Sequence, residues 1–112
     1  MDNTTIGKRL KSARESLGFT QEQVARYIGT SREAISYIET GARPVNTLML
    51  QKIADLYGYK LSYFVEEVIK EEKPYVATAF RIRDIGDNDL EILAQVNRVV
   101  MNLDNLYRLL ES

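Results

Sequence analysis

The side chains that could do chemistry in this chain are hydroxyls, amides, guanidinium groups and carboxylates, because its 112 residues include no histidine and no cysteine. That absence removes zinc-finger ligand sets, disulfides, Cys or His nucleophiles and the commonest general base. The densest group of acids is better explained as a solvated charge run than as a catalytic or metal site, and it comprises Glu66, Glu67, Glu71 and Glu72. We therefore expect no enzyme activity, no catalytic residues, no metal and no cofactor.

A second group of polar side chains follows one side of a short apolar pattern. Ala34, Ile35 and Ile38 recur at the spacing of one helix face. The polar residues opposite them are Ser31, Arg32, Glu33, Ser36 and Tyr37. These polar groups stand where a core helix would be apolar, so this side of the helix is a candidate binding surface.

The elements that would position these residues are short helices. Apolar spacing and stop signals predict five of them, over residues 4–17, 20–28, 31–40, 46–58 and 60–68. Thr20 and Gln23 have the spacing of a capping box, Thr30 or Ser31 caps the third helix, and Asn46 or Thr47 caps the fourth. Two short helices joined at Gly29 form a helix-turn-helix, which presents its second helix to the major groove of DNA.

Net charge is a weak guide to the partner. The whole chain carries −1, but residues 1–68 carry nine basic and eight acidic side chains, whereas residues 69–112 carry six and eight. A total charge does not report a locally basic face. The N-terminus has no secretory pattern and no apolar run approaches a membrane span, so we expect a cytoplasmic protein with no membrane partner.

The run "FTQEQVARYIGTSREAISYIETGARPVNTLMLQKIADLYG" resembles the lambda-repressor/Cro-like helix-turn-helix family, also called the xenobiotic-response-element family. The resemblance covers residues 4–68. It implies an all-α fold in which residues 1–68 form a five-helix DNA-binding domain that binds double-stranded DNA as a dimer.

The resemblance also implies roles for individual residues. Gln21 would touch phosphate and support a base contact, and Thr20 would join it at the DNA backbone. The groove-facing positions would be Ser31, Arg32, Glu33, Ser36 and Tyr37. Arg32 could fork onto guanine O6 and N7 and Glu33 could accept from cytosine N4. Alternatively, Glu33 stabilises its own helix dipole, and Tyr37 either contacts a thymine methyl or phosphate or is a half-buried surface aromatic.

The resemblance also implies further phosphate contacts and an ion pair that stabilises the fold. The loop and the start of the fourth helix would contact phosphate through Thr40, Arg43, Asn46 and Thr47. The alternative for Arg43 is a solvated loop cation. Arg14 and Glu39 occupy the positions of the family's internal ion pair, which makes them structural residues rather than base readers.

The C-terminal third has a different organisation. The charges at 70–73 and Pro74 predict a linker over 69–86, of which 75–85 reads as an extended arm or short strand. Asp87 or Asn88 would cap a last helix over 87–112, with a heptad seam at Ile92, Val96, Val99, Leu103, Leu106 and Leu110, widened by Leu93, Val100 and Tyr107. This helix either packs on its own core or forms a homodimer.

The segment "AFRIRDIGDNDLEILAQVNRVVMNLDNLYRLL" resembles the region that joins such domains to phage-immunity-type zinc metallopeptidases. No metallopeptidase motif is possible here without histidine. The sequence therefore favours a dimeric repressor of a pseudo-palindromic operator. The alternative is an antitoxin or protein-interaction module that binds a metallopeptidase or toxin through its C-terminal segment.

Overall fold

The computed structural model describes residues 2–66 and 87–111, and within them every regular element is a helix. The helices are α1 (Asn3–Leu17), α2 (Gln21–Ile28), α3 (Arg32–Thr40), α4 (Thr47–Tyr57), α5 (Leu61–Val65) and α6 (Asp87–Glu111). The all-α prediction, with five helices and a long C-terminal one, is confirmed. The extended arm or strand predicted over 75–85 lies outside the described residues.

Side-chain caps explain where the helices begin. The Thr20 hydroxyl accepts a hydrogen bond from the Gln23 amide at 3.0 Å while the Gln23 side chain accepts from the Thr20 amide at 2.9 Å, so the predicted capping box is present. Ser31, rather than Thr30, caps α3, and Asn46, rather than Thr47, caps α4. The predicted fifth helix was too long, because the backbone is already extended at Glu66.

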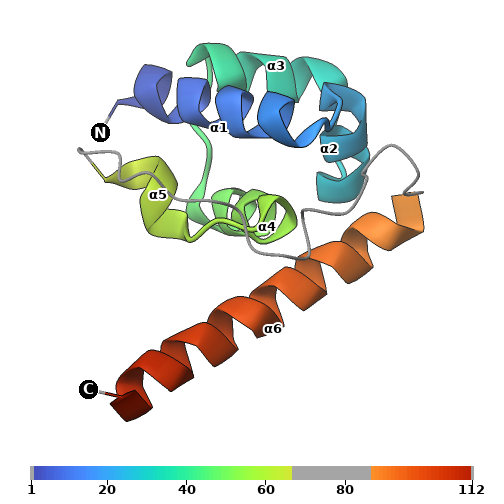
Figure 1. The fold of residues 1–112 in the computed structure, drawn as a ribbon. Helices are drawn as coiled ribbons and strands as arrows, with labels where there is room; N and C mark the ends of the chain where they lie inside the picture. Colours follow the sequence, from blue (N-terminus) through green and yellow to red (C-terminus); the bar gives the residue numbers. More distant parts are fainter. Residues whose placement is uncertain (1, 67–86, 112) are drawn as a thin grey trace.

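The core lies between α1, α2, α4 and α5. Leu10, Val24, Leu56 and Phe64 are almost completely buried there. Tyr57 joins them at the end of α4, with its ring stacked on Phe19 at 5.7 Å between centroids. Figure 1 shows α1 and α3 running side by side on the far side of the domain from α6. This packing holds α3 at the surface of the domain.

A close approach between α1 and α3 requires glycine at position 7. A Cβ on Gly7 would lie 2.4 Å from the carbonyl oxygen of Ile38 and 2.6 Å from that of Glu39. Gly7 is in the interior of α1, where glycine is otherwise an unfavourable choice. Its role is to let α1 touch the backbone at the end of α3.

The long helix α6 is attached to the domain through the stretch from Leu90 to Met101. Leu90, Leu93, Ala94 and Met101 are buried there, as is the amide of Asn97. The contacts are with α4 and α2, and the second half of α6 projects past the domain (Figure 1). In the part of the chain that the structure describes, none of the helices combines the length and apolar composition needed to cross a bilayer.

Candidate nucleic-acid interface

Helix α3 separates its side chains into a buried face and an exposed face. Ile35 and Ile38 are buried and anchor the helix to the core. On the other side Ser31, Arg32, Glu33 and Tyr37 are exposed, and Ser36 is half-buried. The polar residues predicted to face a groove therefore lie together on one open surface of a firmly held helix.

A buried ion pair fixes the end of α3 against α1 and α2. Arg14 Nε donates to Glu39 Oε2 at 2.7 Å, and Arg14 Nη2 donates to Glu39 Oε1 at 3.1 Å. Gln21 Nε2 donates to the same Glu39 Oε1 at 3.0 Å. Both partners of the pair are largely buried. The two residues predicted as a structural pair are thus brought together, and they also hold Gln21 at the start of α2.

The electrostatics of this group follow from burial and charge. Burial by itself would lower the pKa of Arg14, but the hydrogen bond and the charge of Glu39 outweigh it, so the pKa is raised. Burial also raises the pKa of the neighbouring Tyr57, and the negative charge of Glu39 adds to this effect. Arg14 therefore stays positively charged, and the pair is a fixed part of the scaffold.

The starts of α2 and α3 border one shallow hollow of about 370 Å³. The residues that line it are Arg14, Phe19, Thr20, Gln21, Glu22 and Arg32. Arg32 reaches it from the first turn of α3. The residues that were predicted to contact phosphate from α2 and a base from α3 therefore share one concave surface. A hydroxyl, an amide and a guanidinium group at this spacing suit an anionic, hydrogen-bonding partner.

Tyr37 and Arg43 form a pair that the sequence did not reveal. The Arg43 guanidinium carbon lies 4.8 Å from the centre of the Tyr37 ring, in cation–π geometry. The Arg43 amide and the Thr40 hydroxyl both donate to the Tyr37 carbonyl, each at 3.2 Å. Arg43 is exposed, and its guanidinium lies over the Tyr37 ring of α3. The sequence signal is weak, since the pairing depends on the chain reversing at Gly41.

The remaining predicted phosphate contacts lie at the start of α4. Asn46 and Thr47 are exposed, and the Asn46 side-chain oxygen accepts from the Met49 amide at 2.7 Å. Its side-chain NH₂ group and the Thr47 hydroxyl are the donors that a phosphate could use. The structure thus places them on the surface at a helix N-terminus, which favours anions.

A second candidate surface is the outer seam of α6, defined as Ile92, Val96, Val99, Leu103, Leu106 and Leu110. These six side chains are 43% to 77% exposed, and Tyr107 beside them is 64% exposed. Leu93 does not belong to this surface, because it is buried against the domain, and Val100 is half-buried at the boundary. The two alternatives for this helix are therefore not exclusive: one face packs on its own core and the other is uncovered.

Comparisons with known proteins agree with this geometry. A family model described as helix-turn-helix matches residues 10–64. The uncharacterised HTH-type transcriptional regulator YqaF of Bacillus subtilis is 36% identical over 66 residues, covering 59% of this chain and 87% of YqaF. The HTH-type transcriptional regulator PuuR of Escherichia coli is 37% identical over 70 residues, covering 62% of this chain but only 38% of PuuR.

A third relative extends into the C-terminal part. Antitoxin PezA of Streptococcus pneumoniae is 28% identical over 109 residues, which is 96% of this chain and 62% of PezA. The chain thus spans well under half of PuuR and somewhat under two thirds of PezA. No solved structure matches significantly.

Proposed function

Because this chain belongs to the lambda-repressor/Cro-like, xenobiotic-response-element family of helix-turn-helix transcriptional regulators, we propose that it is a dimeric repressor of a pseudo-palindromic operator. Family membership makes it a DNA-binding regulator. The dimer, the repression and the operator symmetry are the proposal, and such a regulator would act in the cytoplasm. The observation that carries the proposal is the open polar face of α3 beside the hollow shared with Thr20 and Gln21.

The contacts of α3 support a division between base reading and phosphate binding. Arg32 is exposed in the first turn, where side chains of a recognition helix reach base edges. Phosphate contacts would come from the rim around it, from Thr20, Gln21, Thr40, Arg43, Asn46 and Thr47. Tyr37 is placed in both groups, since it is exposed on α3 and its ring packs against the Arg43 guanidinium.

The outer seam supports self-association through α6. Its residues step by four and three, the spacing at which two helices interlock, and they are uncovered in the single chain. A second copy offers the same stripe, so a two-fold interface covers both seams at once. Two recognition helices could then reach successive turns of the groove, about 34 Å apart.

An experiment on the full chain tests this function. Selection of bound duplexes from a random pool should enrich a two-fold symmetric sequence whose half-sites lie about one helical turn apart. Sedimentation at the same concentrations should show a dimer. Absence of any preferred duplex at low salt, or enrichment of a single half-site by a protein that stays monomeric, would contradict the proposal.

The second candidate is an antitoxin or interaction module that binds a toxin or metallopeptidase through the C-terminal segment. The similarity to antitoxin PezA, which runs through α6 as well as the domain, favours it. The two functions predict different occupants of the outer seam. Co-expression of the full chain with the product of an adjacent gene should yield a stoichiometric complex under this alternative, and Val99→Asp should abolish that complex. A complex that forms unchanged with Val99→Asp would exclude the seam as the binding surface.

A further inference from the structure

We propose that Asn97 is the positioning residue that sets the distance between the two half-sites, because it fixes the angle at which α6 leaves the DNA-binding domain. This inference rests on the proposed dimeric function. Asn97 lies on the buried face of α6, whereas the outer seam lies on the uncovered face. Asn97 therefore lies between the surface that would join two copies and the domain that would read DNA.

The contacts of Asn97 are with the end of α4. Its Nδ2 donates to the Asp55 carbonyl at 3.0 Å and to the Leu56 carbonyl at 3.2 Å. Both carbonyls belong to the last turn of α4, where helix geometry leaves carbonyl groups without an intrahelical partner. Asn97 is completely buried, so water cannot replace its amide there. The Asn97 side chain thus caps the last carbonyl groups of α4 and, through the same two bonds, attaches α6 to α4.

Stability alone does not explain an asparagine at this position. Its Oδ1 is buried and has no hydrogen-bond partner among the described residues, and burying an unpaired oxygen costs free energy. An amide among apolar neighbours instead selects one register, as a buried asparagine does in coiled coils. Leu90, Leu93, Ala94 and Met101 bury one apolar face of α6 but set no hydrogen-bond direction. The two bonds from Asn97 to the carbonyls of α4 set one.

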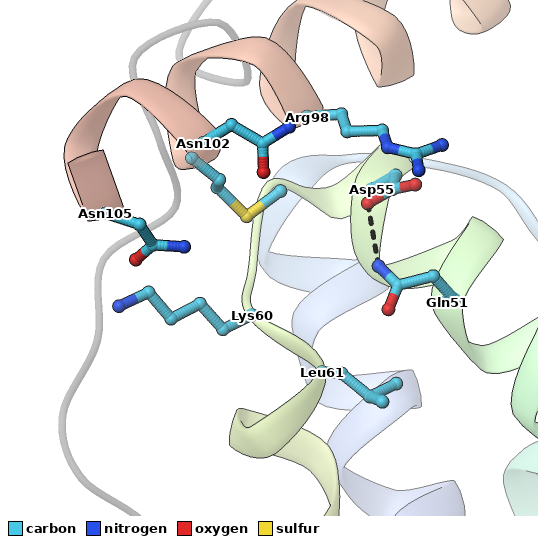
Figure 2. Close-up of a pocket in the computed structure, with 8 residues that line it drawn as sticks. Gln51, Asp55, Lys60, Leu61, Arg98, Asn102 and Asn105 are labelled. Carbon is cyan, nitrogen blue, oxygen red and sulfur yellow. Dashed lines mark hydrogen bonds between the residues drawn. The ribbon is translucent and has the colours of Figure 1, made fainter.

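Besides the bonds of Asn97, the α4–α6 boundary is held by buried apolar contacts and by the attraction between the Arg98 guanidinium of α6 and the Asp55 carboxylate of α4. Beside this boundary lies a polar cleft of about 300 Å³, lined by Gln51, Asp55 and Lys60 on one side and by Arg98, Asn102 and Asn105 of α6 on the other (Figure 2). Gln51 Nε2 donates to Asp55 Oδ1 at 2.9 Å within α4, so this bond does not hold α6. The buried apolar contacts of α6 end at Met101. Asn97 lies within this buried stretch, and its two hydrogen bonds give α6 a directional contact with the end of α4.

The consequence for a dimer is geometric. If two copies meet along the outer seam, the separation of their α3 helices follows from the angle between α6 and α4. With α6 docked, one separation is favoured and operators of one spacing bind best. With α6 loosened, it becomes a flexible tether that still joins two domains but lowers their effective concentration at paired half-sites.

The experiment compares Asn97→Leu with the matched control Asn105→Leu, which makes the same exchange at an exposed position of α6. Full-length variants are measured on a set of operators whose half-sites are moved apart by two, four and six base pairs. For Asn97→Leu we expect an intact dimer by sedimentation and a loss of about tenfold in the preference for the best spacing. Asn105→Leu should keep the wild-type profile.

The possible failures are distinguishable. An Asn97→Leu dimer with the wild-type spacing profile would overturn the role of Asn97. Asn97→Ala, which is smaller and avoids overpacking, is tested in parallel. If both variants fail to fold by circular dichroism, Asn97 is a stability residue and the inference is wrong. If the wild-type protein has no spacing preference or does not dimerise, the proposed function itself has failed.

Discussion

The domain formed by residues 2–66 and the helix α6 use their apolar side chains in different ways. In the domain, the only large apolar side chains left exposed among the described residues are Tyr37, Leu48 and Val65. In α6, which has only 25 residues, the whole outer seam is exposed together with Tyr107 and Leu109. The domain, with the inner face of α6 packed on it, leaves few large apolar side chains exposed, whereas the outer face of α6 is uncovered. A contiguous exposed stripe of this kind marks an interaction site.

A buried polar group in the domain and one in α6 also differ in how they are hydrogen-bonded. Arg14 and Glu39 neutralise each other and are hydrogen-bonded to Gln21 and to the Phe19 carbonyl. Asn97 on α6 has its NH₂ group bonded, whereas its Oδ1 has no hydrogen-bond partner among the described residues. The ion pair therefore holds α1, α2 and α3 together, whereas Asn97 attaches α6 to the end of α4. Substitutions at different sites should therefore affect folding, association or base reading one at a time.

The largest effect is expected from breaking the ion pair in the domain. Glu39→Gln leaves the Arg14 guanidinium buried without its counter-charge, and removing one partner of a buried pair costs about 3–5 kcal/mol. Urea unfolding followed by circular dichroism measures the loss. The control is Glu22→Gln, which affects the exposed Glu22–Arg26 pair at 4.0 Å and should cost at most about 0.5 kcal/mol. Equal losses in the two variants would show that the buried pair is not a stabilising element.

A smaller effect, and on association rather than folding, is expected in the outer seam. Val99→Asp places a carboxylate in the apolar stripe of each copy, which we expect to weaken the dimer by about 2–4 kcal/mol, or roughly 30- to 1,000-fold. Sedimentation over a concentration series measures this, and the unfolding free energy of the domain should stay unchanged. Asn105→Asp introduces the same carboxylate at an exposed position outside the seam and should leave the dimer intact. A Val99→Asp dimer of wild-type affinity would remove the seam from the interface.

The contact between α1 and α3 gives the third prediction. Gly7→Ala would normally favour a helix, but here the new Cβ meets the Ile38 and Glu39 carbonyl oxygens, so we expect a loss of about 1–3 kcal/mol. Ser12→Ala on the exposed side of α1 is the control and should be neutral or slightly stabilising. Thermal unfolding of both variants checks this. A Gly7→Ala protein as stable as the wild type would mean that α1 can withdraw from α3 at no cost.

How far the sequence predicted the fold depended on whether the signal was local. Helix starts were predictable because Thr20, Ser31 and Asn46 bond to amides three residues away. The end of α5 was not, because the apolar pattern continues beyond Val65 although the helix does not. Gly7 also gave no usable signal, since the groups that require it come from α3.

The candidate site shows the same limit. The polar face of α3 and the Arg14–Glu39 pair could be assigned from the helical spacing and the family resemblance. The Tyr37–Arg43 stack could not, since it depends on the turn after α3. In α6 the heptad pattern did not reveal that Leu93 packs on the domain, because a helix with two apolar faces has overlapping periodicities. Which face meets which partner is decided by tertiary packing.

The smallest expected effect concerns base reading and should leave both folding and association unchanged. Arg32 is exposed and makes no contact on which the core depends, so Arg32→Ala removes only what its guanidinium does at the groove. We expect a loss of about 1–3 kcal/mol in discrimination at one position of each half-site, because a forked contact to guanine is replaced by none. Arg26→Ala removes the same charge from α2 and should weaken binding equally for all operators or not at all. Measuring the binding of both variants to every single-base operator variant separates a base contact from a phosphate contact. A uniform loss for Arg32→Ala would make Arg32 a phosphate contact and leave base reading to other side chains of α3.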